Sequence, residues 1–180
     1  MKEKQKNFIR NAIGSSFGLG LSPVLPGSFG TLPAVLLHWL FIQVNRDFVI
    51  QLVFLFVYML LVSLIHYRLT EWAIRYYKTN DPGQFVLDEI VGYLYTQIQF
   101  ILMLLVFKPA FLTDSDGSFT LGKMILWGFL FFRILDMIKI PPAWQVDKKM
   151  HGATGILLDD IISGFYAAIL MYALFHFSVL

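Results

Sequence analysis

The chain alternates between long apolar runs and short polar stretches. Four of the runs are close to the roughly 20 residues that an α-helix needs to cross a bilayer, namely residues 48–66, 90–107, 121–138 and 156–179. A fifth run, residues 32–44, is shorter, so it predicts either a further crossing or a re-entrant helix buried against its neighbours. The pattern predicts an all-α, polytopic membrane helical bundle that forms a single domain over residues 1–180.

The composition excludes several other classes of protein. Of the 180 residues, 57% are hydrophobic and only 14% are charged, which is typical neither of a water-soluble globule nor of a disordered chain. Fourteen Lys and Arg against twelve Asp and Glu leave a formal charge of +2, and no basic stripe suggests a nucleic-acid partner. Because the chain has no cysteine, any metal ion must be bound by oxygen or imidazole ligands.

The basic residues predict how the chain is oriented in the membrane. If the short run crosses, the basic N-terminal segment 1–13 lies on the same side as loops 67–89 and 139–155, which hold most of the other Lys and Arg. Three basic residues lie on the opposite side: Arg46, Lys108 and Lys123. By the positive-inside rule, the N-terminus and both loops are cytoplasmic and the C-terminus is outside. Residues 108–120 are then predicted to form a solvated turn on the outer side.

Acidic residues gather near the cytoplasmic ends of the predicted spans. Four of them lie in or beside apolar runs, namely Asp88, Asp136, Asp159 and Asp160. An ionised carboxylate costs about 2.5–3.5 kcal/mol at the bilayer centre and less near the surface, so these acids need partners. Helix capping is one explanation for Asp88, Glu89 and Asp159. Asp136 lies at the C-terminal end of its span, where the helix dipole disfavours an anion, so capping does not explain it. An ion pair with Arg133, three residues earlier, explains Asp136 as well as a role in a site does.

A magnesium site would give these acids a common role. Mg²⁺ prefers oxygen ligands and usually takes one or two carboxylates together with substrate phosphate and water. The candidate ligands are Asp88, Glu89, Asp136, Asp159 and Asp160. Arg133 and Lys139 are then predicted to bind phosphate oxygens, the arginine as a bidentate donor and the lysine as a point charge.

Two acidic segments resemble each other, at residues 87–92 and 158–164. Each has a leucine, two acids and two branched apolar residues ahead of a glycine. We expect the two helices to place their acidic first turns side by side, with Gly92 and Gly164 allowing close approach. Because adjacent helical residues point about 100° apart, only one of Asp159 and Asp160 is expected to face a shared ion.

The glycine-rich segment before residue 32 is a candidate phosphate cradle. It ends with Gly27, Ser28, Gly30 and Thr31, directly ahead of a predicted helix. Backbone N–H groups and hydroxyls at a helix N-terminus can bind an anion, but a Gly/Pro-rich hairpin capped by Thr31 explains the same residues. His151, in a polar loop, is a candidate to donate to phosphate or relay a proton. The remaining histidines are predicted to be packing or interface residues: His38, His66 and His176.

Four sequence blocks contain most of these unusual residues. They are GLGLSPVLPGSFGTLPA from Gly18, DPGQFVLDEIVG from Asp81, FRILDMIKIPP from Phe132 and HGATGILLDDIISG from His151. Taken in order, the blocks resemble the phosphatidylglycerophosphatase A family over residues 14–164. The resemblance implies these functional positions: Pro26, Gly27, Gly30, Thr31, Asp88, Glu89, Arg133, Asp136, Lys139, Asp147, His151, Gly152, Asp159 and Asp160. The chain departs from the family pattern at Ser28, Ile140, Ala153 and Ser163, and no departure removes a charged group.

The resemblance implies a bacterial inner-membrane lipid phosphatase that hydrolyses phosphatidylglycerophosphate to phosphatidylglycerol and inorganic phosphate, with Mg²⁺ as cofactor. The catalytic residues that it implies are Asp136, Asp159, Asp160 and His151. Attack by a metal-activated water and attack by an aspartate, which would form an aspartyl-phosphate, both stay open. The main alternative is a small ion-coupled transporter that uses the same carboxylates, although a transporter would hold them near the midplane. The sequence determines neither the oligomeric state nor the range of lipid phosphates accepted.

Overall fold

The computed structural model describes residues 2–109 and 120–177, and this part of the chain is all-helical. The helices in chain order are α1 (Glu3–Gly14), the short 3-10 helix η1 (Leu19–Leu21), α2 (Pro26–Val44), α3 (Phe48–Tyr77), α4 (Leu87–Phe107), α5 (Leu121–Ile138), α6 (Ala143–Lys149) and α7 (Gly152–His176). The all-α prediction is confirmed. Most of the predicted outer turn at residues 108–120 lies outside the described residues.

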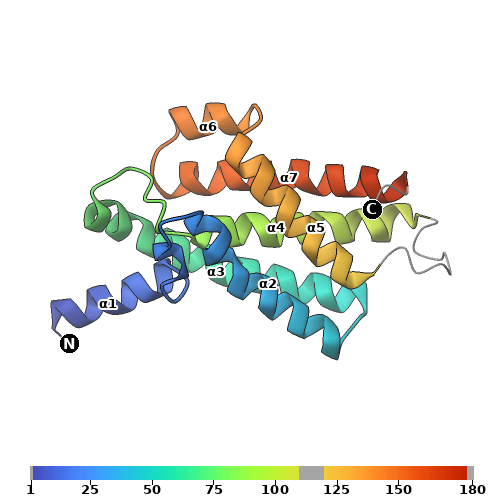
Figure 1. Ribbon diagram of the computed structural model, residues 1–180, viewed down its shortest axis with the longest axis horizontal. Coiled ribbons are helices and arrows are strands. Elements are labelled where there is room, and N and C mark those ends of the chain that lie inside the picture. Colours follow the sequence, from blue (N-terminus) through green and yellow to red (C-terminus); the bar gives the residue numbers. More distant parts are fainter. Residues whose placement is uncertain (1, 110–119, 178–180) are drawn as a thin grey trace.

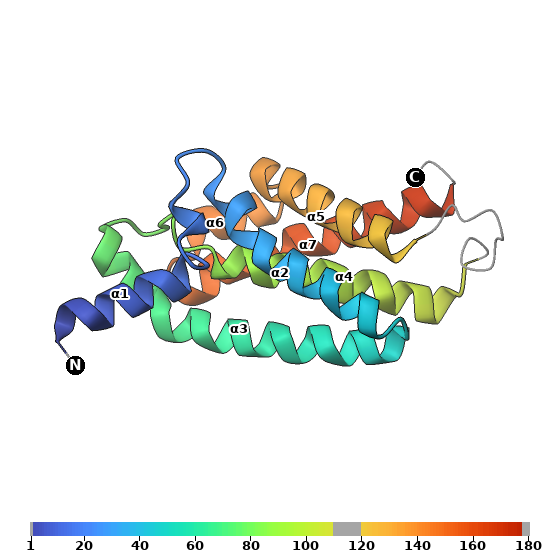
Figure 2. The ribbon, with the colours of Figure 1, turned by 60° about the horizontal axis from the view of Figure 1, so that its bottom comes forward.

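The five long helices run along the long axis of the molecule and alternate in direction (Figure 1). The turn between α2 and α3, the start of α5 and the end of α7 lie at one end of the bundle. Helix α1, the connection from α3 to α4, and α6 lie at the other end, as Figure 2 also shows. This alternation is the one expected if all five helices cross a membrane.

Four helices are long and apolar enough to cross a bilayer: α2, α3, α4 and α7. Helix α5 is the predicted span at residues 121–138, and its 18 residues include three charged ones, Lys123, Arg133 and Asp136. The short run at residues 32–44 belongs to a 19-residue helix that begins earlier, at Pro26. With a rise of 1.5 Å per residue, α2 is about 28 Å long and runs in one direction, which fits a crossing and not a re-entrant helix.

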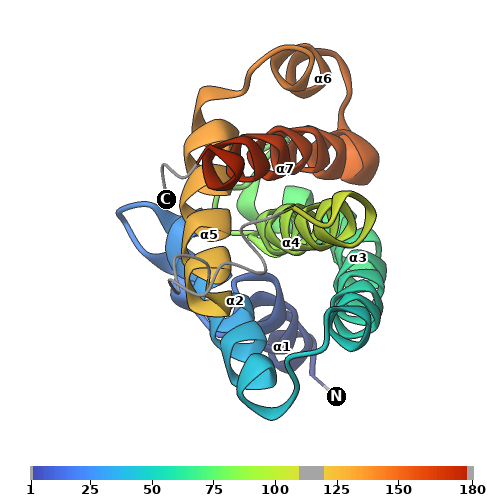
Figure 3. The ribbon, with the colours of Figure 1, turned by 90° about the vertical axis from the view of Figure 1, so that its right-hand side faces the viewer.

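Helix α4 lies in the middle of the bundle, between α3, α5 and α7 in the end-on view (Figure 3). Its side chains Tyr93, Leu94, Phe100 and Ile101 are fully buried. In contrast, α3 exposes large apolar side chains such as Leu64 along the bundle surface. Exposed apolar surface of this extent is typical of a protein surrounded by lipid.

Helices α4 and α7 pack closely at glycines, as predicted. A Cβ atom on Gly164 would lie 2.7 Å from the carbonyl oxygen of Gly92, so neither position has room for a side chain. The prediction that Asp159 and Asp160 occupy a first helical turn is wrong. Helix α7 begins at Gly152, so the two acids lie two turns inside it and helix capping does not explain them.

Two of the histidines expected to be packing residues are fully buried in the bundle. The Nδ1 atom of His38 lies 3.0 Å from the hydroxyl oxygen of Tyr93, and the Nε2 atom of His66 donates to the carbonyl oxygen of Ala153. These contacts join α2 to α4, and α3 to the start of α7. Each of these histidines therefore connects two helices inside the bundle.

Candidate active site

A small cavity of about 190 Å³ lies at the α1 and α6 end of the bundle, and acidic side chains line it. The acids come from α4, α5, α7 and the loop before α4, and they are Asp81, Asp88, Glu89, Asp136, Asp159 and Asp160. Lys139 lines the same cavity, together with apolar side chains such as Phe85, Met137 and Ile156. The structure therefore brings together all five predicted metal ligands and one of the two predicted phosphate-binding cations.

The glycine-rich N-terminal segment holds the start of α4 in place. The backbone N–H of Val86 donates to the carbonyl oxygen of Gly14 at 2.9 Å. A Cβ atom on Gly14 would lie 2.8 Å from the Phe85 ring, and one on Gly20 would lie 2.8 Å from Val86. Because these glycines leave room for Phe85 and Val86, Asp88 and Glu89 in the next helical turn reach the cavity.

Part of the predicted phosphate cradle is the interior of a helix. Because α2 begins at Pro26, which suits the first helical position, only Gly27 and Ser28 belong to its first turn. The hydroxyl of Thr31 donates to the carbonyl oxygen of Gly27 at 2.7 Å, and Gly30 packs against Val86. The expectation that Thr31 caps the helix is wrong, and neither Gly30 nor Thr31 lines the cavity.

Arg133 joins three helices beside the cavity. Its Nη1 atom lies 2.9 Å from Oδ2 of Asp136 and 3.9 Å from Oε1 of Glu89, and its Nε donates to the Ser28 hydroxyl at 3.2 Å. The side chain is only 9% exposed. The absence of a side chain at Gly27 allows this packing, because a Cβ atom there would lie 2.5 Å from Nη2 of Arg133. The predicted ion pair between Arg133 and Asp136 is therefore present. It lies beside the acidic cavity, so the ion pair and the cluster of acids exist together.

Lys139 ends α5 in a left-handed conformation and bridges two other helices. Its Nζ atom donates to Asp147 in α6 and to Asp159 in α7, each at 2.7 Å. Burial by itself lowers the pKa of the ammonium group, but the two hydrogen-bonded carboxylates outweigh it, so the pKa lies above its ordinary value. Lys139 therefore keeps its positive charge at neutral pH.

The two consecutive acids of α7 have different surroundings, as the helical geometry predicts. Asp159 faces Lys139 through Oδ2, whereas Asp160 lies against α4, where a Cβ atom on Gly92 would lie 3.1 Å from it. Both acids nevertheless line the cavity. One is therefore held by a cation and the other by close contact between helices.

His151 lies in a neighbouring pocket and not in the carboxylate cavity. This second pocket, of about 140 Å³, is also lined by Asn80, Asp147 and Gly155, and it shares Asp81 and Ile156 with the cavity. His151 is exposed, directly before the first residue of α7. The sequence did not single out Asp81 as a site residue, although Asp81 begins the same block as Asp88 and that proximity was the available signal.

The carboxylates have the chemistry of a site for a hard cation. Four buried oxygens have no hydrogen-bond partner among the described residues: Asp88 Oδ1, Glu89 Oε2, Asp159 Oδ1 and Asp160 Oδ2. Burying several carboxylates beside only two cations is unfavourable unless further positive charge is present. Within the described ranges, no three acidic or histidine side chains already form an ion-binding set. The carboxylate oxygens thus suit Mg²⁺, because they are hard donors and several of them have no described hydrogen-bond partner. In the described part of the chain they do not yet lie close enough together to surround one ion.

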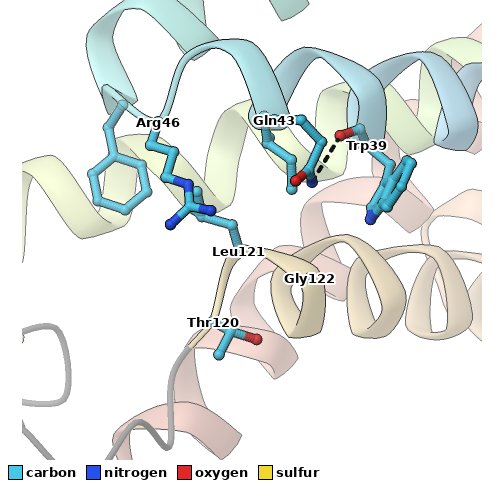
Figure 4. A pocket seen from close by; sticks show the side chains of 8 residues that line it. Trp39, Gln43, Arg46, Thr120, Leu121 and Gly122 are labelled. Carbon is cyan, nitrogen blue, oxygen red and sulfur yellow. Dashed lines mark hydrogen bonds between the residues drawn. The ribbon is translucent and has the colours of Figure 1, made fainter.

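A larger pocket of about 490 Å³ lies at the opposite end of the bundle (Figure 4). Trp39 and Gln43 near the end of α2, and Arg46 in the turn that follows it, face the start of α5, where Thr120 caps the helix. No carboxylate is among the described residues that line it. The smaller cavity, with its acids and Lys139, therefore remains the candidate active site.

The chain is similar to known proteins over almost its whole length. The family model for phosphatidylglycerophosphatase A matches residues 12–175. The chain belongs to the phosphatidylglycerophosphatase A family. The family name denotes phosphoric monoester hydrolases, and the chain is an enzyme of this class. The match extends from α1 to the last turn of α7, so it includes every residue of the cavity.

Three relatives of the chain span most of its length. Phosphatidylglycerophosphatase A of Escherichia coli K12 is 31% identical over 160 residues, 89% of this chain and 80% of the relative. A Bacteroides thetaiotaomicron protein, provisionally named a phosphatidylinositol-3-phosphatase, is 29% identical over 171 residues, 93% of this chain and 94% of its own. Phosphatidylglycerophosphatase A of Haemophilus influenzae is 25% identical, over 88% and 83% of the two chains. No solved structure is significantly similar to the chain.

Proposed function

We propose that this protein hydrolyses the terminal phosphate monoester of phosphatidylglycerophosphate and releases phosphatidylglycerol and inorganic phosphate. The observation that supports this most directly is the cavity lined by carboxylates from three helices together with Lys139, whose ammonium group donates to Asp159. Such a cavity suits a phosphate group together with a divalent cation. The family and the names of two relatives indicate the same substrate.

The position of the cavity suits a substrate that stays in the membrane. The cavity lies at one end of the helices that are long enough to cross a bilayer, where a lipid headgroup would lie. We propose that this end is cytoplasmic, in a bacterial inner membrane, because it carries the basic helix α1 and most of the other Lys and Arg. Carboxylates at one end of the bundle, and not midway along it, favour hydrolysis over ion-coupled transport.

The residues proposed to hold Mg²⁺ are Asp88, Glu89, Asp136, Asp159 and Asp160. A bound Mg²⁺ would supply charge neutralisation at the phosphate and a water of lowered pKa. Arg133 and Lys139 would bind the non-bridging phosphate oxygens, with Ser28 and Asp147 holding the two cations in place.

The proton transfers are assigned to acids of the cavity. In-line attack by water forms one P–O bond and breaks the bond to the glycerol oxygen. One carboxylate of the pair Asp159 and Asp160 would accept the proton of the attacking water, and the glycerol oxygen must gain a proton as it leaves. His151, in the adjoining pocket, is proposed to relay that proton. If an aspartate attacks instead, borohydride would trap a labelled phosphoenzyme.

Phosphate release from pure lipids tests the proposal. Purified protein should release inorganic phosphate from dioleoyl phosphatidylglycerophosphate with Mg²⁺ and lose this activity with EDTA. Asp136→Asn and Asp159→Asn should each lower the rate at least about 10²-fold, a loss typical of a group that acts in the transition state. Asp47→Asn is the matched control, because Asp47 caps α3 at the opposite end and asparagine also caps helices well.

Three results would contradict parts of this scheme. Full turnover in EDTA would refute the metal requirement. Full activity of both cavity variants would refute the assigned site. Release of phosphate from phosphatidylinositol-3-phosphate, but not from phosphatidylglycerophosphate, would replace the proposed substrate with the one for which the Bacteroides relative is named.

A further inference from the structure

An apolar groove of about 590 Å³ runs between α2 and α5, outside the carboxylate cavity. Leu32, Leu36 and Trp39 form the α2 wall, and Gly122, Leu126 and Phe129 form the α5 wall. Its volume lies within the range of pockets that bind small molecules. Leu36 is 55% exposed and Leu126 is 52% exposed, so the groove opens sideways at the depth of the bilayer. Hydrocarbon is the ligand that such a surface selects.

The walls of the groove lead to the candidate active site. On α5, the residues Gly122, Leu126, Phe129, Arg133 and Asp136 follow one another at intervals of four or three and share one helix face. The α2 wall extends in the same way, because Ser28 lies one turn before Leu32. Figure 2 and Figure 3 show that α2 lies beside α5.

The two walls meet at a polar contact next to the cavity. The Nε atom of Arg133 donates to the Ser28 hydroxyl at 3.2 Å, one turn beyond the last apolar residue of each wall. The Nη1 atom of Arg133 then lies 2.9 Å from Asp136, which lines the cavity. A single phosphate group near Arg133 would therefore be close to both the apolar groove and the carboxylates.

We propose that the α2–α5 groove binds one acyl chain of the phospholipid substrate while Arg133 binds its phosphate. This inference rests on the proposed function, because it assigns a second part of the same substrate. An acyl chain fixed in the groove orients the phosphate relative to the acids of the cavity. Binding energy from the chain, which takes no part in the reaction, thereby contributes to catalysis.

The alternative occupant of the groove is a lipid of the opposite leaflet. The groove shares Trp39 and Gly122 with the pocket of Figure 4, where Arg46 could bind the phosphate of a lipid from the other leaflet. The substrate chain is the favoured occupant because the groove at the Arg133 end continues to the reacting acids. At the Arg46 end, no described lining residue is a carboxylate.

Filling the groove tests the proposal. Gly122→Phe places a ring in it without a backbone clash, since a Cβ atom at Gly122 would have only Thr120 Oγ1, at 3.8 Å, as a described neighbour within 4 Å. The kcat/KM for dioleoyl phosphatidylglycerophosphate should fall about tenfold, whereas both kcat and KM for the dihexanoyl substrate should stay unchanged. Leu64→Phe on the exposed face of α3 is the matched control and should change neither.

The outcomes separate this proposal from the proposed function. Equal losses on both substrates, or no loss on either, would overturn the acyl-chain assignment. A chain-length effect produced by Arg46→Gln would assign the groove to a lipid of the opposite leaflet and would also overturn it. If the unmodified protein hydrolyses neither substrate, the proposed function fails independently of the groove.

Photocrosslinking tests the groove without any turnover. The probe is a phosphatidic acid with a diazirine at the end of one acyl chain, which carries the same phosphate monoester chemistry. Crosslinks should fall on α2 and α5 peptides and decrease at least fivefold in Gly122→Phe. Crosslinks on α3, or an unchanged pattern in Gly122→Phe, would contradict the proposal.

Discussion

Single residues at the candidate site act in pairs, and Lys139 is the clearest example. The sequence predicts Lys139 as a phosphate ligand, but the lysine also holds Asp147 and Asp159 at 2.7 Å each. Neither contact is predictable from spacing, because Asp147 belongs to a short helix and Asp159 lies two turns inside α7. The acids themselves were predictable, since charged residues in apolar runs are conspicuous.

Replacing Lys139 separates its two roles. Lys139→Met should lower stability by about 1–3 kcal/mol, because the buried carboxylate of Asp159 loses its partner. It should also lower phosphate release at least about 10²-fold, as the loss of a transition-state cation does. The double variant Lys139→Met, Asp159→Asn should recover thermal stability in detergent but not activity. Because Asp159→Asn alone is expected to lose activity, recovery of activity in the double variant would contradict the catalytic roles proposed for both Lys139 and Asp159.

Gly27 tests how tightly Arg133 and Glu89 are held. A Cβ atom on Gly27 would overlap the Glu89 carboxylate and crowd Arg133, so Gly27→Ala should displace both side chains. We expect a loss of activity of about 10–10²-fold, because small displacements of catalytic groups are costly. Leu64→Ala is the control, since Leu64 is exposed on α3 and lines neither the cavity nor the α2–α5 groove. Equal kinetics for the two variants would show that the Arg133 position is unimportant.

At the scale of helices, the apolar runs predict which elements form but not where each helix begins. Helix α2 starts six residues before its apolar run, at Pro26, and α7 starts four residues before its run, at Gly152. Both extra turns have polar or glycine-rich sequences, which look like loops. The glycine-rich segment was also ambiguous, because glycines that pack against Phe85 and Val86 look the same in sequence as glycines that expose N–H groups to phosphate.

The contact between α4 and α7 is expected to limit the stability of the bundle. Gly164→Ala should lower the free energy of unfolding by about 1–3 kcal/mol, because the added methyl group meets the Gly92 carbonyl oxygen at 2.7 Å. The measurement is thermal unfolding in detergent, with Gly122→Ala for comparison, because a Cβ atom on Gly122 meets only ordinary contacts among the described residues. An unchanged melting temperature would contradict this expectation, because it would show that the contact between α4 and α7 accepts an added methyl group.

At the scale of the whole molecule, the alternating helices place the candidate site and most basic residues at one end. The sequence predicts that the basic residues gather at one end, because the loops on one side of the predicted spans contain many more Lys and Arg than those on the other side. It does not predict the position of α4 in the middle of the bundle, since α3 is more apolar than α4 and yet lies on the surface of the bundle. That position follows from contacts with several helices at once.

The lack of cysteine allows a direct test of orientation. Lys6→Cys and Asn80→Cys should react with a membrane-impermeant maleimide only after the cells are permeabilised. Arg46→Cys, in the turn between α2 and α3 at the opposite end of the bundle, should react in intact spheroplasts. The reverse pattern would invert the proposed topology, and labelling of all three in intact cells would contradict a membrane-spanning arrangement.

The sideways opening of the α2–α5 groove has a kinetic consequence. An enzyme that is loaded laterally meets its substrate by two-dimensional diffusion, so its velocity follows the mole fraction of that lipid within the vesicle. Diluting the vesicles with an inert phospholipid would slow turnover, whereas adding more vesicles of unchanged composition at saturating lipid would not alter it.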